Sequence, residues 1–408
     1  MMKTIKTLQI NGYESPGKRF NGISIAPHLK KQGIETNHLI WQIDANNENV
    51  NSIGGAFTKL INVIVRRLEE RLSIQSIIYP HGLQILWSKH FRNSDLVHLH
   101  IIHSGYFSFA HLPILTGKKP TIWTIHDPWA LTGHCIYPIE CNKWQTGCGS
   151  CPDLKSQLPL RNDNTKFLFN FKKNIYKKCK FQIVVASEWM KNFIEASPMF
   201  QGVRVNKIPF GIDLNYFSPH ANPLARKRFD IRDDEIVISF RALNNNIKGF
   251  QYIVEALKLI NSDRNICLLT LNQSGLLDQF KGRFKIIELG WRNDDEIVRD
   301  VYLASDIFLM PSVGEAFGMM AIEAMACSKP VIVFEGTALP ETCFCPDVGI
   351  AVPIKDHVAL ANAIQMLIDS PEERIIRGQR GREIAKIHYD EITYANRMAD
   401  LYRATLGL

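Results

Sequence analysis

Short apolar runs alternate with longer amphipathic stretches along most of the 408-residue chain. The short runs have the length of buried strands, and the stretches between them repeat apolar residues at helical spacing. Strands are predicted at 7–11, 38–42, 96–102, 121–125, 182–186 and 203–208 in the first half, and at 236–240, 267–271, 285–289, 307–310 and 331–334 in the second. Helices are predicted between them, among others at 21–32, 57–72 and 164–179. Strands that alternate with helices indicate an α/β protein with parallel sheets.

The length of the chain predicts two domains rather than one. We expect a Rossmann-like domain at 1–210, a turn-rich linker at 211–219 and a second Rossmann-like domain at 220–388. The segment 389–408, after a break near 388–390, is expected to be a helix that packs back toward the first domain. Doubly wound domains bind ligands at the carboxyl ends of their strands, so we expect a cleft between the domains to hold the substrate.

The most informative segment lies between the predicted strands at 307–310 and 331–334. It contains small residues and two carboxylates, Glu315 and Glu323. The pattern of strand, turn, helix and strand predicts a helix that begins near Glu315. The free N–H groups and the positive dipole end at its start would suit a phosphate. Glu323, about two turns further along, could then reach hydroxyl groups of the same ligand. The alternative is an ordinary helix with two acidic residues.

Two cations follow the first strand of the second domain. Arg241 ends the predicted strand, and Lys248 with Gly249 opens the next helix. Both side chains could neutralise a diphosphate leaving group, because the departure of phosphate needs charge compensation more than covalent help. The alternative is a pair of solvated surface charges.

The first domain offers a histidine and a glycine turn. His126 follows the predicted strand at 121–125, and Asp127 and Pro128 turn the chain away. This histidine could donate a hydrogen bond to a sugar hydroxyl or orient an acceptor, or it could simply cap its own strand. Gly17, in the turn after the first strand, is a weak phosphate signal because it stands alone.

The composition is that of a globular enzyme, with 46% hydrophobic and 22% charged residues. No apolar run reaches the roughly 18 residues that span a bilayer, and the start of the chain lacks a signal-peptide core, so the cytoplasm is the expected location. The net charge of +8 is unevenly divided, since residues 1–215 have 26 basic and 14 acidic side chains. This excess predicts a polyanionic partner, first of all a membrane surface. Nucleic acid is not expected, because its binding motifs are absent.

The densest basic cluster lies at 172–180, with four aromatic residues nearby, Phe167, Phe169, Phe171 and Tyr176. It could form a membrane-seeking amphipathic helix face or an ordinary solvated face.

Together, His126-Asp127, Arg241…Lys248-Gly249 and Glu315…Glu323, with seven residues between the glutamates, resemble the retaining glycosyltransferases of family 4. Gly211-Ile212-Asp213…Phe217-Ser218-Pro219 and Leu339-Pro340-Glu341 also match the family pattern, so the resemblance covers nearly the whole chain. It implies the GT-B architecture, in which two Rossmann-like domains face each other across a cleft.

The resemblance also implies roles for individual residues. His126 would lie beside the transferred sugar, and Arg241 and Lys248 would bind the donor diphosphate. Glu315 would contact the sugar, and Glu323 would hold the ribose hydroxyls. Phe317, Gly318 and Gly17 complete the expected donor site. The family reacts with retention of anomeric configuration and without a catalytic metal. Two loops depart from its pattern, because Pro16-Gly17 replaces paired glycines and Gln273-Ser274-Gly275 replaces a Gly-x-Gly.

Four cysteines, Cys135, Cys141, Cys148 and Cys151, lie in the loop 132–152 with five, six and two residues between them. The last pair has zinc-knuckle spacing, and four thiolates can close a tetrahedral structural zinc site. Reduced thiols and disulfides are the alternatives, of which disulfides are disfavoured in the cytosol. The pattern resembles an insertion in a polysaccharide-biosynthesis subset of the same family, and it would shape the acceptor side beyond His126.

The predicted function is therefore transfer of a hexose from a UDP- or GDP-sugar to a lipid-linked or oligosaccharide acceptor of a cell-surface polysaccharide such as lipopolysaccharide. The enzyme would be cytoplasmic and bound peripherally to the inner face of the membrane. The alternatives are a sugar-nucleotide epimerase of the same fold and a non-catalytic GT-B partner subunit.

Overall fold

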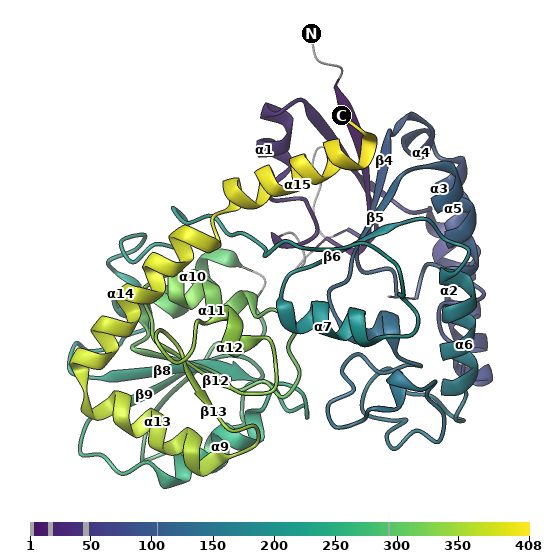
Figure 1. Cartoon of the computed structure of the whole chain (residues 1–408). Helices are drawn as coiled ribbons and strands as arrows, with labels where there is room; N and C mark the ends of the chain where they lie inside the picture. Colours follow the sequence, from purple (N-terminus) through teal and green to yellow (C-terminus); the bar gives the residue numbers. More distant parts are fainter. Residues whose placement is uncertain (1–3, 15–18, 44–48, 104, 293) are drawn as a thin grey trace. The chain divides into compact units, whose positions relative to one another are not determined.

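The computed structural model describes residues 4–14, 19–43, 49–103, 105–292 and 294–408. It divides into two compact units. Unit 1 consists of Met1–Gly211 and Ile392–Leu408, and unit 2 of Ile212–Glu391. The chain therefore passes between the units twice (Figure 1).

Unit 1 is built on a seven-stranded parallel sheet with the order β3-β2-β1-β4-β5-β6-β7. The strands are β1 Ile5–Tyr13, β2 Ile34–Gln42, β3 Val50–Ser52, β4 Leu96–Leu99, β5 Thr121–Thr124, β6 Gln182–Val185 and β7 Val205–Lys207. The central strands are buried on both faces, as parallel strands between helix layers must be. The order reverses at β1 and β4, and in such sheets ligands bind beside this point, at the carboxyl ends of the strands.

Helices cover the sheet of unit 1. They are α1 Ala26–Lys31, α2 Ala56–Leu72, α3 His81–Trp87, α4 Lys89–Asn93, α5 Leu112–Lys118, α6 Thr165–Tyr176, α7 Glu188–Ala196 and α15 Glu391–Leu406. Figure 1 shows α15, in yellow, running beside the purple N-terminal strands. It belongs there because Tyr394, Met398 and Tyr402 are buried on one helix face, at the spacing of an apolar stripe.

Unit 2 contains a six-stranded parallel sheet with the order β10-β9-β8-β11-β12-β13. Its strands are β8 Ile236–Ala242, β9 Ile266–Asn272, β10 Lys285–Glu288, β11 Ile307–Met310, β12 Val331–Phe334 and β13 Ile350–Val352. Its helices are α8 Ala225–Arg228, α9 Phe250–Leu259, α10 Asp295–Ala304, α11 Met319–Ala326, α12 Leu339–Thr342, α13 His357–Asp369 and α14 Pro371–His388.

The predicted α/β class with two parallel sheets is confirmed, and every predicted strand overlaps a strand of the structure. Two short strands, β3 and β13, are missing from the sequence prediction because three residues make too short an apolar run.

The basic cluster at 172–180 is divided between the core and the surface. Lys172 is buried, and its amino group donates to the carbonyl oxygens of Trp129 at 2.8 Å and Thr132 at 3.0 Å. Phe169 and Tyr176 are buried as well. Lys177, Lys178 and Lys180 are exposed, as is Phe167 at 54%, so a membrane-seeking face at this cluster stays a prediction.

Candidate functional site

In unit 1, a group of polar side chains lies at the carboxyl ends of β1, β4 and β5. His126 follows β5, and its Nε2 lies 3.3 Å from Nδ1 of His100, just past β4. The Nε2 of His100 lies 2.8 Å from Oε1 of Gln9 on β1. Gln9 Nε2 donates to the Tyr402 hydroxyl at 3.1 Å, and that hydroxyl lies 2.8 Å from His98 Nδ1.

The partners fix the positions of the protons in this network. Gln9 Oε1 can only accept, so His100 donates through Nε2 and its Nδ1 accepts. His126 must then donate through Nε2 to His100, which leaves its Nδ1 without a proton. The Tyr402 hydroxyl accepts from Gln9 and also shares a hydrogen bond with His98 Nδ1, whose direction follows the His98 tautomer. His126 thus donates to His100, His100 donates to Gln9, and Gln9 donates to Tyr402.

Burial keeps these histidines neutral. It lowers the pKa of His126 and of His98 to about 3 and that of His38 to about 4, and it holds the pKa of His100 well below its ordinary value. The cause in each case is the cost of placing an imidazolium ion among buried groups. The histidines also oppose one another's protonation, since several stand within reach of their neighbours' charge.

Aromatic rings hold His126 in place. Its ring stacks on Phe210 with 5.4 Å between centroids and an angle of 18°, and it lies 5.1 Å from the ring of Phe20. The turn after it forms as predicted, because Asp127 accepts from the backbone N–H of Trp129 at 2.9 Å and so caps the short 3-10 helix Pro128–Leu131. A neutral, half-buried histidine in a fixed orientation results.

In unit 2, three charged side chains gather at the carboxyl ends of β8 and β11. Lys248 Nζ lies 2.8 Å from Glu315 Oε2, and both side chains are mostly shielded from solvent. Arg241 and Lys248 line one pocket together with the end of β11. Arg241 also donates from Nε to Asn272 Oδ1 at 2.9 Å. Burial lowers the pKa of Arg241, and the charge of Glu315 counteracts this shift. The arrangement offers an anion two partly desolvated cations.

A glycine allows Lys248 to reach this pocket. Gly249 has a φ of +75°, and a Cβ atom at this position would lie 1.8 Å from the carbonyl oxygen of Pro311. Only glycine permits so close an approach of two backbones. The chain from 245 to 248 is further tied by Asn245 Oδ1, which accepts from the N–H groups of Ile247 and Lys248.

The predicted start of the helix near Glu315 is wrong. Helix α11 begins at Met319, after Gly318 with a φ of +101°, and Glu315 lies in the preceding loop. Glu315 thereby comes beside Lys248 instead of capping a helix. The loop is held by the N–H of Ala338, which donates to the Glu315 carbonyl oxygen at 3.0 Å.

The other expected donor-site residues are more buried than the sequence suggested. Glu323 is 1% exposed and accepts a hydrogen bond from the Tyr302 hydroxyl at 2.8 Å. The Phe317 ring is buried against Tyr389, edge to face, with 5.7 Å between centroids. Gly17 lies outside the described residues.

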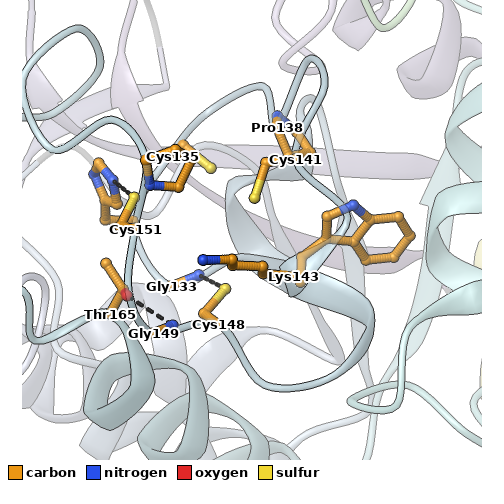
Figure 2. A pocket seen from close by; sticks show the side chains of 12 residues that line it. Gly133, Cys135, Pro138, Cys141, Lys143, Cys148, Gly149, Cys151 and Thr165 are labelled. Atoms are coloured by element: carbon orange, nitrogen blue, oxygen red, sulfur yellow. Dashed lines mark hydrogen bonds between the residues drawn. The ribbon is translucent and has the colours of Figure 1, made fainter.

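The four loop cysteines line one pocket, together with Lys143 and Trp144 among others (Figure 2). Cys148 Sγ accepts from the backbone N–H of Gly133 at 3.2 Å, and Cys151 Sγ lies 3.4 Å from His134 Nε2. Burial raises the pKa of Cys135 to about 12 and that of Cys148 to about 11. In the described part of the chain, no group of three or more His, Cys, Asp or Glu side chains is arranged to hold a metal ion.

Sequence reasoning missed four members of the histidine network, Gln9, His98, His100 and Tyr402. Tyr402 lies more than 300 positions from His98, so no local motif links them. The one available signal was His98-x-His100 inside the predicted strand 96–102, where side chains two apart share a face.

Residues 24–216 match the family model described as Glycosyltransferase Family 4, and residues 234–370 match the one described as Glycosyl transferases group 1. The chain belongs to glycosyltransferase family 4. A D-inositol 3-phosphate glycosyltransferase from Mycobacteroides abscessus is 30% identical to this family 4 glycosyltransferase over 279 residues, which cover 65% of the chain and 59% of that enzyme. An enzyme of the same name from Corynebacterium kroppenstedtii is 23% identical over 407 residues, which cover 92% of the chain and 84% of that enzyme.

Solved GT-B glycosyltransferases share the fold of the family 4 glycosyltransferase. Sucrose-phosphate synthase from Thermosynechococcus elongatus is 18% identical, with a TM-score of 0.70 and 99% of both chains covered. Anabaena Alr3699/HepE in complex with UDP and glucose is 15% identical, with a TM-score of 0.68 over 98% of this chain and 100% of the other. WaaG, a glycosyltransferase involved in lipopolysaccharide biosynthesis, is 14% identical, with a TM-score of 0.66 over 97% and 99%. The predicted GT-B class is therefore confirmed.

Proposed function

We propose that this glycosyltransferase moves a hexose from a nucleoside diphosphate donor, a UDP- or GDP-sugar, to a lipid-linked or oligosaccharide acceptor of a cell-surface polysaccharide. The observation that carries the proposal is the pocket of unit 2, where Arg241 and Lys248 meet beside Glu315. A diphosphate is the ligand whose charge and size suit two partly buried cations.

Donor binding would rearrange this ion pair. Lys248 is bonded to Glu315 at 2.8 Å, so an arriving diphosphate would compete with the carboxylate for the ammonium group. A displaced Glu315 could then accept from hydroxyl groups of the sugar. Arg241 would keep its bond to Asn272 and offer its remaining N–H groups to a phosphate oxygen. As the leaving diphosphate gains charge, both cations stabilise it, which removes the need for a catalytic metal.

We assign His126 to the transferred sugar. Because its Nε2–H is used by His100, the ring would act on a ligand through Nδ1, as an acceptor from a sugar hydroxyl rather than as the donor expected from the sequence. Its neutral state avoids repulsion of the positive charge that develops on the anomeric carbon. Glu323 would hold the ribose hydroxyls, and Phe317 and Gly318 would contribute backbone N–H groups at the start of α11. We propose retention of configuration, with attack on the face that the leaving group departs.

Two names among the relatives support the choice of substrates. The Anabaena protein was solved with UDP and glucose, and WaaG acts in lipopolysaccharide biosynthesis. The epimerase and the non-catalytic subunit remain the alternatives. An epimerase would convert the nucleotide sugar without an acceptor, and a non-catalytic subunit has no reason to retain Arg241, Lys248, Glu315 and Glu323 together.

A thermal-shift screen of the purified protein against UDP, GDP, ADP, CMP and dTDP tests the donor site. A nucleotide that binds only the folded protein raises the free energy of unfolding, by about 2.7 kcal/mol when its concentration is a hundred times the Kd. The Tm rises with it. We expect UDP or GDP to raise the Tm and Lys248→Ala to abolish the rise. No shift with any of the five nucleotides would contradict the proposal.

Structural zinc in the cysteine loop stays a prediction. The four thiols share a pocket, and an all-sulfur donor set suits Zn²⁺, but they are not arranged around a common point as they stand. Metal analysis of the purified protein decides the matter. One zinc per chain, lost in Cys148→Ser and kept in Cys179→Ser, would support the site, and metal-free protein with four reactive thiols would contradict it.

A further inference from the structure

Helix α2 exposes an apolar stripe along its whole length. Phe57, Leu60, Ile64, Leu68 and Leu72 are 75%, 61%, 62%, 46% and 48% exposed. Their spacing of three or four residues places them in one row on the helix surface. Such a row is unusual on a soluble surface, where apolar side chains are normally scattered.

The helix is nevertheless firmly attached to unit 1. Its inner face buries Thr58 and Glu69, and the Glu69 carboxylate accepts from the backbone N–H groups of Ser76, Ile77 and Ile78 at 2.8 to 3.0 Å. Gln84 of α3 donates to the Thr58 hydroxyl at 3.1 Å. The exposed row is therefore the outer side of a helix already packed, rather than a core face that has come loose.

Basic side chains border the stripe. Arg67 and Arg71 are exposed and follow Ile64 and Leu68 by three residues, which places them beside the row. Lys59 and Arg66 are also exposed, and the acidic residues of the helix are either buried, as Glu69 is, or paired, as Glu70 is with Arg66 at 3.6 Å. The solvent side of α2 is thus apolar with a positive border.

We propose that α2 docks unit 1 onto an anionic membrane surface, with the apolar stripe in the boundary between headgroups and acyl chains and with Arg67 and Arg71 on lipid phosphates. An amphipathic helix of this kind lies in the plane of the interface, and its 17 residues extend about 25 Å along it. The positive charge of residues 1–215 favours the same partner. Among the described residues no helix is long and apolar enough to cross a bilayer. The proposal rests on the proposed function, since it would bring the enzyme to a lipid-linked acceptor.

Vesicle co-sedimentation of the full chain tests the docking. We expect binding to phosphatidylcholine vesicles that contain about one third phosphatidylglycerol and much weaker binding to phosphatidylcholine alone. The triple variant Leu60→Ser/Ile64→Ser/Leu68→Ser should lower the partition coefficient at least tenfold. Each of Arg67→Gln and Arg71→Gln should lower it about fivefold on anionic vesicles.

The matched control is Trp291→Ser/Ile387→Ser in unit 2, which removes apolar side chains of similar exposure, 60% and 63%. It should bind vesicles as the wild type does. Wild-type binding by the triple variant would overturn the proposal, as would a stripe-dependent dimer in light scattering without vesicle binding. The nucleotide thermal shift separates this result from the proposed function, because the α2 variants should keep it. Vesicle binding without any nucleotide shift would refute the donor site and leave the docking surface standing.

Discussion

The two units hold their functional side chains in opposite ways. In unit 1 His98, His100 and His126 are neutral and lie in one hydrogen-bond network with Gln9 and Tyr402. In unit 2 Arg241, Lys248 and Glu315 are charged and half-buried, and the central contact is an ion pair of 2.8 Å. The hydrogen bonds of the network in unit 1 are made within the protein. In unit 2 an anionic ligand can replace Glu315 as the partner of Lys248.

The difference separates two roles. The network of unit 1 orients a side chain, and the ion pair of unit 2 provides charge for binding a ligand. A closed hydrogen-bond network fixes the direction of one ring, because moving it would leave buried groups unsatisfied. A half-buried ion pair is instead exchangeable, since an incoming anion replaces the carboxylate at little cost. We therefore expect loss of a charged pocket side chain in unit 2 to change chemistry with little effect on stability, and loss of a network side chain in unit 1 to change both.

The largest effect should follow Lys248→Ala. It removes one of the two cations of the donor pocket, and loss of one such group typically costs about 10² to 10³ in kcat. The Tm should change little, because Arg241 remains beside Glu315 and still compensates the charge of the carboxylate. Transfer assays with the donor identified by thermal shift measure the effect. Lys258→Ala is the matched control, since Lys258 forms a similar but exposed pair with Glu255 at 2.7 Å. Unchanged turnover in Lys248→Ala would remove the diphosphate role.

Gly249→Ala should destabilise unit 2 by about 3 kcal/mol or more. The new methyl group would collide with the Pro311 carbonyl oxygen, and the left-handed backbone adds about 1 to 2 kcal/mol. Gly275→Ala is the matched control, because Gly275 also has a positive φ, of +80°, but has open space around its Cβ position. Denaturant unfolding of both variants gives the comparison. Equal losses would mean that backbone conformation, and not the close approach to Pro311, makes Gly249 necessary.

His100→Phe should cost about 2 kcal/mol of stability, because it leaves Gln9 Oε1 and His126 Nε2–H without their partners. If His100 had only a structural role, the loss of stability would be the only effect. If His100 positions His126, the ¹⁵N shifts of the His126 ring should also change from one tautomer to a mixture. His220→Phe, at an exposed position, should change stability by less than about 0.5 kcal/mol. A single unchanged tautomer in His100→Phe would show that the Phe20 and Phe210 rings alone orient His126.

The smallest effect concerns pH. Unfolded histidines bind protons near their ordinary pKa of 6.5, but His38 binds one only near 4 in the folded chain. The unfolded state therefore holds more protons between these values, and stability falls as the pH is lowered through this window. Each such histidine contributes at most about 1.4 kcal/mol per pH unit. His38→Leu also removes a buried Nε2 that has no hydrogen-bond partner. The Tm of His38→Leu should fall less than the Tm of the wild type between pH 7 and 5. Parallel curves of Tm against pH would contradict the lowered pKa of His38.

The sequence was a better guide to the sheets than to the sites. Strands such as 307–310 and 331–334 are continuous apolar runs, so periodicity finds them directly. The small residues near Glu315 predict a helix start there, whereas the left-handed Gly318, packed against Leu339, delays the helix to Met319. The burial of Lys172 has no local sequence signal, because the two carbonyl oxygens that accept from it lie 43 and 40 positions away, at Trp129 and Thr132.

The helix α15 has a consequence for the synthesis of the protein. The Tyr402 hydroxyl completes the hydrogen bonds of Gln9 and His98, yet it is made after the whole of unit 2. On the ribosome, residues 1–211 therefore emerge with these buried groups unsatisfied, and they must wait about 190 codons for their last partner, which at roughly 5 to 20 residues per second is some ten to forty seconds. Unit 2 is a continuous segment and can fold during that interval. The unit that is translated first is thus the one that is finished last.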